Sequence, residues 1–483
     1  MLHNKRKSLK MNIFLNLLKT IFTTFFPLVS FKYVSSVLEK SGIGIINFSN
    51  SIVQYFSIIA ALGVSTYAIR ECTKVRDDRK QLNELSCELF TINVISTVVS
   101  YVCLIIVVLI IPKIFAYRSI VFILSVNIVC TTIGVEWVNI VQEDFLYITV
   151  RTIALQVVSL LLTFIFVRSA DDYIIYAIIT TSTSFFISIL NWFYSKRYVN
   201  LKLVFTRALA KHVKPVLIIF SMNVAITIYV TSDITILGFF KGDAEVGAYT
   251  VATKVYSCLK VMLASVVSAT IPRLSYVIEK DKEEYLNRLK DVISVSLLLC
   301  IPIIVGVFIL PEFLIRTIST EAYFESKTAL QLLGLAVLPT LFSTIINNNI
   351  LLAQRRESFI LFSACMGGVV NIVLNLIFIP LMGMNAAAAT TLFAESLVFL
   401  ISVFQARKTL IRLNVRLLCL DLFKVILGSL GIIILDRLYF LITDETYFSS
   451  IIFVIISAIM YFTLEIVLKQ SGLLLFMKRR NMK

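Results

Sequence analysis

The chain has 483 residues, of which 58% are hydrophobic and only 15% are charged, and its formal net charge is +16. Soluble domains contain about 45–50% apolar and about 25% charged residues, so this composition excludes a water-soluble globular protein. It indicates an integral membrane protein. A nucleic-acid binder is excluded as well, because the excess of lysine and arginine follows the pattern of membrane topology.

Fourteen segments are long and apolar enough to span a bilayer, which takes about 20 mostly apolar residues. In chain order they are residues 11–31, 43–69, 87–111, 119–139, 146–167, 173–194, 214–239, 246–271, 291–311, 329–353, 358–380, 384–405, 417–435 and 448–468. The first is too long for a signal peptide, so we interpret it as an uncleaved span. The connections are too short for a separate soluble domain. The predicted fold class is an all-α membrane protein with about 14 transmembrane helices.

The distribution of basic residues predicts the orientation of these spans. With alternating spans, the side that carries the N-terminus collects 32 lysine and arginine residues, Arg151 among them, and the opposite side collects nine. Basic residues accumulate on the cytoplasmic side of membrane proteins. We therefore expect a multi-pass protein with both termini in the cytoplasm.

A weak internal repeat divides the chain. Gly44 precedes Arg70 by 26 residues, and Gly247 precedes Arg273 by the same distance, with an offset of 203 residues between the two pairs. The offset covers six spans, so both copies start on the same side and the repeat is parallel. We expect an N-lobe at 1–205, a C-lobe at 206–408, and two further helices with a cytoplasmic tail at 409–483.

Polar side chains recur on one helical face in the first two spans of each lobe, which predicts a polar cavity between the lobes. The residues expected to bind substrate there are Asn16, Lys19, Gln54, Tyr55, Lys254 and Lys260. Lys19 lies roughly 12 Å inside its span. A lysine at the centre of a bilayer costs about 2.5–3.5 kcal/mol, so such cations must face water, a counter-ion or an anionic ligand.

Acidic residues inside the spans have two interpretations. Asp233 and Glu395 are candidates for binding a coupling proton or cation, or alternatively for a buried ion pair with the lysines. Glu465 and Lys469 lie four residues apart near the inner end of the last span, which predicts an interfacial salt bridge.

Several motifs are missing from the sequence. It contains no phosphate-binding loop of the GxxxxGK[ST] type and no HExxH. Its eight cysteines form no CxxC and no zinc-type spacing with its two histidines. We therefore expect no catalytic residue, no metal and no cofactor.

Four stretches of the chain resemble the polysaccharide biosynthesis protein family, which includes the Wzx-type O-antigen flippases. The matching residues are Ala61-Leu62-Gly63, Arg70-Glu71 and Lys74-Val75-Arg76-Asp77-Asp78 in the first, Glu136-Trp137, Glu143 and Arg151 in the second, Val246-Gly247-Ala248-Tyr249 and Pro272-Arg273 in the third, and Asn371, Asn375 and Pro380 in the fourth. Their order and spacing carry the resemblance. For Glu143 and Arg151 we expect a role at the cytoplasmic ends of helices.

The resemblance implies the fold of the multidrug/oligosaccharidyl-lipid/polysaccharide (MOP) exporter superfamily, with two parallel six-helix bundles in a V plus two C-terminal helices. It implies a flippase in the bacterial cytoplasmic (inner) membrane that serves O-antigen and lipopolysaccharide synthesis. The implied substrate is an undecaprenyl-diphosphate-linked oligosaccharide, moved from the inner to the outer leaflet by alternating access. The implied partners are membrane lipids and other polysaccharide assembly proteins. We expect no nucleic-acid partner.

Two alternatives remain open from the sequence. One is a multidrug or metabolite exporter of the same superfamily. The other, from a different class, is a membrane glycosyltransferase or polymerase, against which the short outer loops argue.

Overall fold

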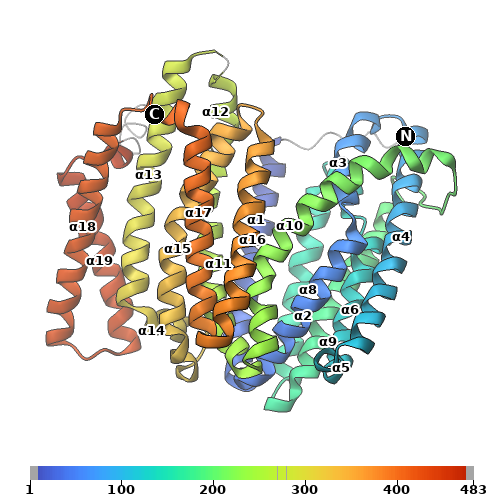
Figure 1. Cartoon of the computed structure of the whole chain (residues 1–483), viewed down its shortest axis with the longest axis horizontal. Helices are drawn as coiled ribbons and strands as arrows, with labels where there is room; N and C mark the ends of the chain where they lie inside the picture. The colour runs from blue at the N-terminus through green and yellow to red at the C-terminus, as the bar shows by residue number, and fades with distance from the viewer. Residues whose placement is uncertain (1–8, 269, 279, 475–483) are drawn as a thin grey trace. The chain divides into compact units, whose positions relative to one another are not determined.

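The computed structural model describes residues 9–268, 270–278 and 280–474, and these residues form helices and connecting loops without a β-strand (Figure 1). Fourteen helical segments of the described chain are long and apolar enough to cross a membrane, as the sequence predicts. The protein is therefore an all-α, multi-pass membrane protein. Its contacts define two compact units, Met1–Thr250 and Val251–Lys483. The finer division at residues 205 and 408 stays a prediction.

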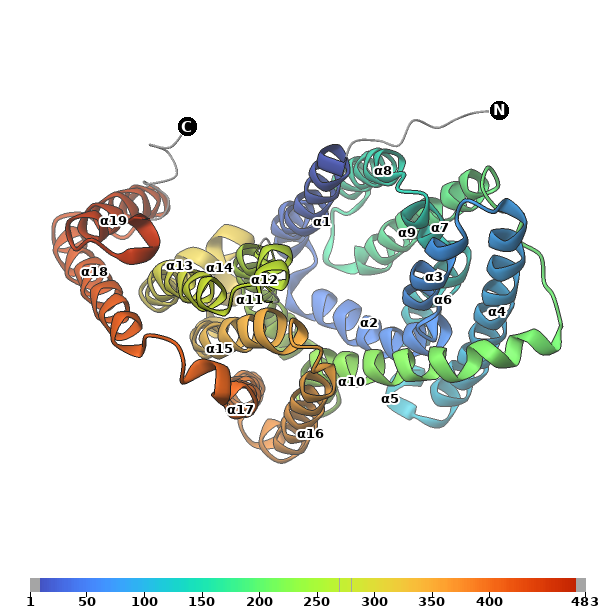
Figure 2. The same ribbon diagram turned by 90° about the horizontal axis from the view of Figure 1, so that it is seen from above.

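The first unit is built around α2. Its helices are α1 (Leu9–Val37), α2 (Glu39–Ala61), α3 (Val64–Cys72), α4 (Arg79–Ile110), α5 (Pro112–Ala116), α6 (Arg118–Ile133), α7 (Glu136–Val141), α8 (Phe145–Phe166), α9 (Tyr173–Ser195), α10 (Ala210–Phe240) and the start of α11 (Asp243–Ser268). α2 packs against α4, α6 and α10, while α8 packs against α1 and α9 (Figure 2). This packing places polar side chains of α1, α7, α8 and α9 next to one another.

Two of the predicted spans of this unit are interrupted. Between α2 and α3, Leu62 and Gly63 adopt left-handed backbone conformations, with φ of 47° and 75°. Between α6 and α7, Val135 has a φ of 31°, which is uncommon for a β-branched residue. Each break redirects the chain while the apolar pattern of the sequence continues through it. The second break determines where Glu136 points.

The two glycines of the internal repeat lie at one helix crossing, where the starts of α2 and α11 meet. A Cβ atom on Gly44 would lie 1.7 Å from the carbonyl oxygen of Asp243, and one on Gly247 would lie 2.0 Å from that of Lys40. Only glycine permits such close approach of two backbones. The two contacts are reciprocal. Gly44 touches Asp243, which lies four residues before Gly247, and Gly247 touches Lys40, which lies four residues before Gly44.

The second unit contains the remaining helices. They are the rest of α11, then α12 (Ile271–Val277), α13 (Lys282–Ile309), α14 (Pro311–Ile318), α15 (Lys327–Ile345), α16 (Glu357–Met382), α17 (Met384–Leu410), α18 (Val415–Ile442) and α19 (Tyr447–Val467). α15 packs against α13 and α17, and α13 packs in turn against α18. The hairpin of α18 and α19 lies at the edge of this unit beside α13 (Figure 2). Its apolar side chains, such as Phe423 and Ile434, are exposed and suited to face lipid.

Candidate functional site

The first unit contains a cluster of charged and amide side chains inside its membrane spans. Lys19 of α1 donates to Glu136 Oε1 at 2.5 Å, and Arg151 of α8 donates to Glu136 Oε2 at 2.9 Å. The carboxylate therefore lies between two cations. Its position follows from the break at Val135, which makes Glu136 the first residue of α7, where a negative charge interacts favourably with the helix dipole.

Asn191 of α9 fixes the other side of this cluster. Its side-chain oxygen accepts hydrogen bonds from Arg151 and from Asn139 Nδ2, and its amide nitrogen donates to the Gly134 carbonyl that the helix break leaves open. The Arg151 side chain is only 3% exposed, and its charged group lies 5.3 Å from the centre of the Tyr147 ring. Two cations share one carboxylate, so the cluster retains a net charge of +1.

The structure therefore changes the interpretation of two sequence predictions. Lys19 forms an ion pair with Glu136, and not with Asp233 or Glu395 as the sequence suggests. The resemblance predicts that Arg151 lies at a helix end, but Arg151 is the seventh residue of α8 and is buried. Glu143 does lie at a helix end, where it accepts from Arg76 at 2.6 Å. That contact raises the pKa of the Arg76 guanidinium.

Further polar contacts join α2 to α10. Tyr55 Oη and Thr235 Oγ1 lie 3.0 Å apart, and Thr235 donates to Ser51 Oγ at 2.8 Å. The buried Asp233 accepts a hydrogen bond from Tyr249 Oη at 2.9 Å. The contacts of Thr235 attach α10 to α2, and the hydrogen bond from Tyr249 attaches α10 to the start of α11.

The remaining predicted residues of the first unit, Asn16 and Gln54, have exposed side chains. An exposed amide within a membrane span is unfavourable against hydrocarbon, so it requires water or a polar ligand. Neither side chain lies in the charged cluster around Glu136.

The second unit places Lys260 next to an aromatic ring. Its ammonium lies 4.4 Å from the centre of the Tyr256 ring, on the same helix α11. Tyr256 Oη lies 3.0 Å from Thr340 Oγ1 and donates a longer hydrogen bond, 3.3 Å, to the buried Glu395. Tyr256 thus connects the lysine of α11 to the acid of α17. Lys254, earlier on α11, is half-buried.

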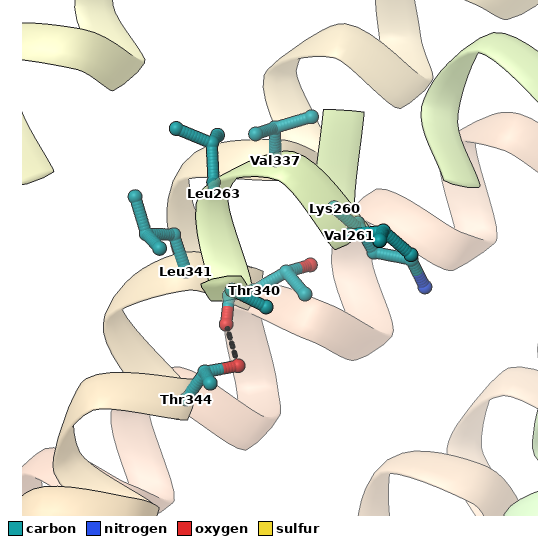
Figure 3. Close-up of a pocket in the computed structure, with 8 residues that line it drawn as sticks. Lys260, Val261, Leu263, Val337, Thr340, Leu341 and Thr344 are labelled. Atoms are coloured by element: carbon teal, nitrogen blue, oxygen red, sulfur yellow. Dashed lines mark hydrogen bonds between the residues drawn. The ribbon is translucent and has the colours of Figure 1, made fainter. Parts of the chain in front are cut away.

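A cavity of about 270 Å³ lies beside Lys260, between α11 and α15 (Figure 3). It is lined by Lys260, Val261, Leu263, Ala264, Val337, Thr340, Leu341 and Thr344. The ammonium of Lys260 points away from the other labelled side chains in Figure 3. Thr340 and Thr344 are linked by a hydrogen bond from the Thr344 hydroxyl to the Thr340 carbonyl. The cavity is apolar for most of its wall, with one cation and two hydroxyls at its margin.

A larger apolar cavity of about 360 Å³ lies elsewhere in the second unit, where α13 and α14 face α18 and α19. Its lining includes Pro302, Gly306, Phe313, Ile432, Phe453 and Tyr461. Its apolar lining suits an aliphatic chain.

Four residues of these sites are not predicted as binding candidates from the sequence, namely Glu136, Arg151, Asn191 and Tyr256. Glu136 and Arg151 were available as charges within or beside predicted spans, and a charge at such depth is itself a signal. The count of basic residues on the two sides of the membrane places Arg151 with the cytoplasmic loops, which hides this signal. Asn191 and Tyr256 carry no charge, so only their contacts identify them.

Comparisons with known proteins add to this description. A family model described as "Polysaccharide biosynthesis protein" matches residues 9–278, and one described as "MatE" matches residues 218–377. A protein of Escherichia coli strain K12, described as "Putative O-antigen transporter", is 25% identical over 291 residues, which are 58% of this chain and 67% of that protein.

Solved structures share the fold at low sequence identity. A structure described as "Lipid II flippase MurJ, inward closed conformation" has a TM-score of 0.77 at 15% identity and covers 94% of this chain and 98% of its own. An inward-facing multidrug resistance MATE transporter of the MOP superfamily has a TM-score of 0.63 at 14% identity, covering 80% and 94%. These likenesses establish the fold of the chain.

Proposed function

The chain belongs to the polysaccharide biosynthesis protein family, and we propose that it is a flippase for undecaprenyl-diphosphate-linked oligosaccharide repeat units. In this proposal it moves them from the inner to the outer leaflet of the bacterial cytoplasmic membrane by alternating access. It acts as a transporter and not as an enzyme. The similarity to the Escherichia coli protein described as "Putative O-antigen transporter" supports the substrate class.

The observation that carries the proposal is the presence of cations within the membrane spans of both units. A diphosphate cannot enter hydrocarbon without fixed positive charges to replace its hydration. The cluster around Glu136 retains one net positive charge. Lys260 lies beside the ring of Tyr256, and it forms no ion pair with a carboxylate among the described residues. We propose that Lys19, Lys254 and Lys260 bind the diphosphate.

The other parts of the substrate require different surfaces. The exposed amides of Asn16 and Gln54 and the hydroxyl of Tyr55 are proposed to hydrogen-bond sugar hydroxyls. The apolar cavity beside α18 and α19 suits a segment of the polyprenyl tail. Asp233 and Glu395 remain the proposed coupling residues, each buried and held by a tyrosine hydroxyl.

A multidrug or metabolite exporter is the second candidate function. The match of residues 218–377 to the MatE model favours it. The two candidates differ in their cargo, since an exporter of small molecules needs no site for a diphosphate.

Transport in proteoliposomes tests the proposal. Purified protein is reconstituted with a fluorescent undecaprenyl-diphosphate oligosaccharide, and a membrane-impermeant lectin reports which leaflet holds the glycan. We expect protein-dependent movement, reduced at least tenfold in a Lys19→Met, Lys254→Met, Lys260→Met triple variant, because charge-assisted hydrogen bonds contribute about 1.5–3 kcal/mol each. The control is Lys241→Met, an exposed lysine just after α10.

Three results would contradict the proposal. They are an absence of glycan movement in folded protein, efflux of small cationic drugs without glycan movement, and sugar transfer by the purified protein. The second result would favour the exporter.

A further inference from the structure

The last membrane span contains a carboxyl group in an unusual environment. Glu465 of α19 is fully buried, with 0% of its surface exposed. Neither carboxyl oxygen has a hydrogen-bond donor among the described residues. Its oxygen Oε1 packs against Gly428 of α18, so closely that a Cβ atom on this glycine would lie 2.4 Å away. The sequence-based prediction of a salt bridge between Glu465 and Lys469 is therefore wrong.

The prediction fails for a geometric reason. α19 ends at Val467, and Lys469 has a left-handed backbone with a φ of 52°. A spacing of four residues places two side chains on one face only within a continuous helix. The Lys469 carbonyl instead accepts a hydrogen bond from Lys424 Nζ of α18 at 3.0 Å. Lys424 is thus the cation of the neighbouring helix, and it is bound to a backbone oxygen.

Side chains of α18, α19 and α13 surround Glu465 and the neighbouring Asp421. α18 contributes Asp421 and Lys424, whose charges act on the carboxyl in opposite directions. α19 itself contributes Tyr461, whose hydroxyl donates to the Leu298 carbonyl of α13 and not to Glu465. From α13, Ser294 faces Asp421 and is not titratable.

A second buried carboxyl in the same hairpin provides an internal comparison. Asp421 is 1% exposed, but its oxygens accept hydrogen bonds from Ser294 Oγ at 2.7 Å, Ser471 Oγ at 2.9 Å and Ser471 N at 3.2 Å. Three donors can stabilise a buried carboxylate. Glu465 has none, and burying an ionised carboxylate without donors costs several kcal/mol.

We propose that Glu465 is a proton-binding site: its carboxyl is protonated while Lys424 binds the Lys469 carbonyl, and it releases the proton when Lys424 turns to pair with it. Release forms a carboxylate and delivers the proton to water at the adjacent end of α19. The same event removes the hydrogen bond from the end of α19. Proton occupancy would therefore be linked to the packing of α18 on α19. This inference concerns the hairpin alone and does not depend on the cargo of the transporter.

Thermal unfolding as a function of pH tests the site. At low pH the carboxyl is protonated in both folded and unfolded protein, so it does not make stability depend on pH. As pH rises, the unfolded chain releases its proton before the folded protein does, so wild type loses stability. We expect the melting temperature of wild type, relative to Glu465→Gln, which cannot titrate, to fall as pH rises above about 4.3, the ordinary pKa of glutamate in an unfolded chain, and to level off once the folded protein has also released the proton.

The control is Glu445→Gln, an exposed glutamate in the loop of the same hairpin, which should follow wild type. A melting difference between wild type and Glu465→Gln that is the same at every pH would overturn the proposal.

A second measurement needs no glutamine variant. Dicyclohexylcarbodiimide reacts with protonated carboxyl groups in apolar surroundings, and peptide mass spectrometry identifies the residue modified. In wild type we expect modification of Glu465 that decreases as pH rises. In Lys424→Met the modification should persist to higher pH, because the cation that favours the carboxylate is gone. Identical pH dependence in the two proteins would overturn the exchange between Lys424 and Glu465.

Discussion

The two units of the protein treat a lysine inside a membrane span in different ways. Lys19 forms an ion pair with Glu136 at 2.5 Å, and Arg151 shares the same carboxylate. Lys260 lies 4.4 Å from the Tyr256 ring centre, and the nearby acid, Glu395, is bound to the hydroxyl of that tyrosine. A cation in an ion pair must lose its partner before it binds an anion, whereas a cation on a ring need not. The difference predicts unequal roles for the two lysines.

The largest expected effect is on stability, from removing the acid of the first unit. Glu136→Gln leaves Lys19 and Arg151 without a counter-charge, and breaking a buried pair costs about 3–5 kcal/mol. We expect up to about 3 kcal/mol, because a third of the Glu136 side chain is exposed and its charge is partly solvated. Unfolding by denaturant in mixed micelles measures the loss of stability.

The control for this substitution is Glu312→Gln, which breaks the exposed bridge between Glu312 and Lys327 at 2.8 Å. We expect it to cost no more than about 1 kcal/mol. Adding Lys19→Met to Glu136→Gln should restore part of the stability. Equal losses for the two glutamine variants would show that the Glu136 cluster is no more costly to break than a surface pair.

The next effect concerns binding of the diphosphate group. Lys260→Met should weaken binding of an undecaprenyl diphosphate glycan about 10- to 100-fold, as expected when a charged hydrogen-bond donor is lost. Lys19→Met should weaken it less than tenfold, because opening the pair with Glu136 offsets part of the gain from Lys19. Ligand-dependent shifts in melting temperature measure both variants. Equal losses would remove the distinction between the two lysines.

The smallest effect separates the ring of Tyr256 from its hydroxyl. Tyr256→Phe keeps the ring beside Lys260 and removes the contacts to Thr340 and Glu395. We expect a change in binding of less than about threefold. Tyr256→Leu should cost about tenfold, in line with about 1–2 kcal/mol for a desolvated cation–π contact. If both variants lose binding equally, the hydroxyl and not the ring positions the lysine.

The sequence predicts the fold well because hydrophobic spans of about 20 residues leave a strong signal. It does not predict the breaks at Gly63 and Val135, since a left-handed residue interrupts a helix without interrupting its hydropathy. The sequence does not predict the ion pair of Lys19 and Glu136 for the same reason, because the turn at Val135 directs the carboxylate toward Lys19. The spacing of Glu465 and Lys469 predicts an ion pair only within a continuous helix, and α19 ends at Val467, two residues before Lys469.

The crossing of Gly44 and Gly247 bears on the origin of the chain. Two identical segments that pair about a twofold axis present the same surface to each other, so one glycine per segment makes both close contacts. After a duplication that joined two such copies, each glycine would be constrained by the backbone of the other copy, at Asp243 and at Lys40. Neither glycine could then acquire a side chain on its own, because each one faces the backbone of the other segment.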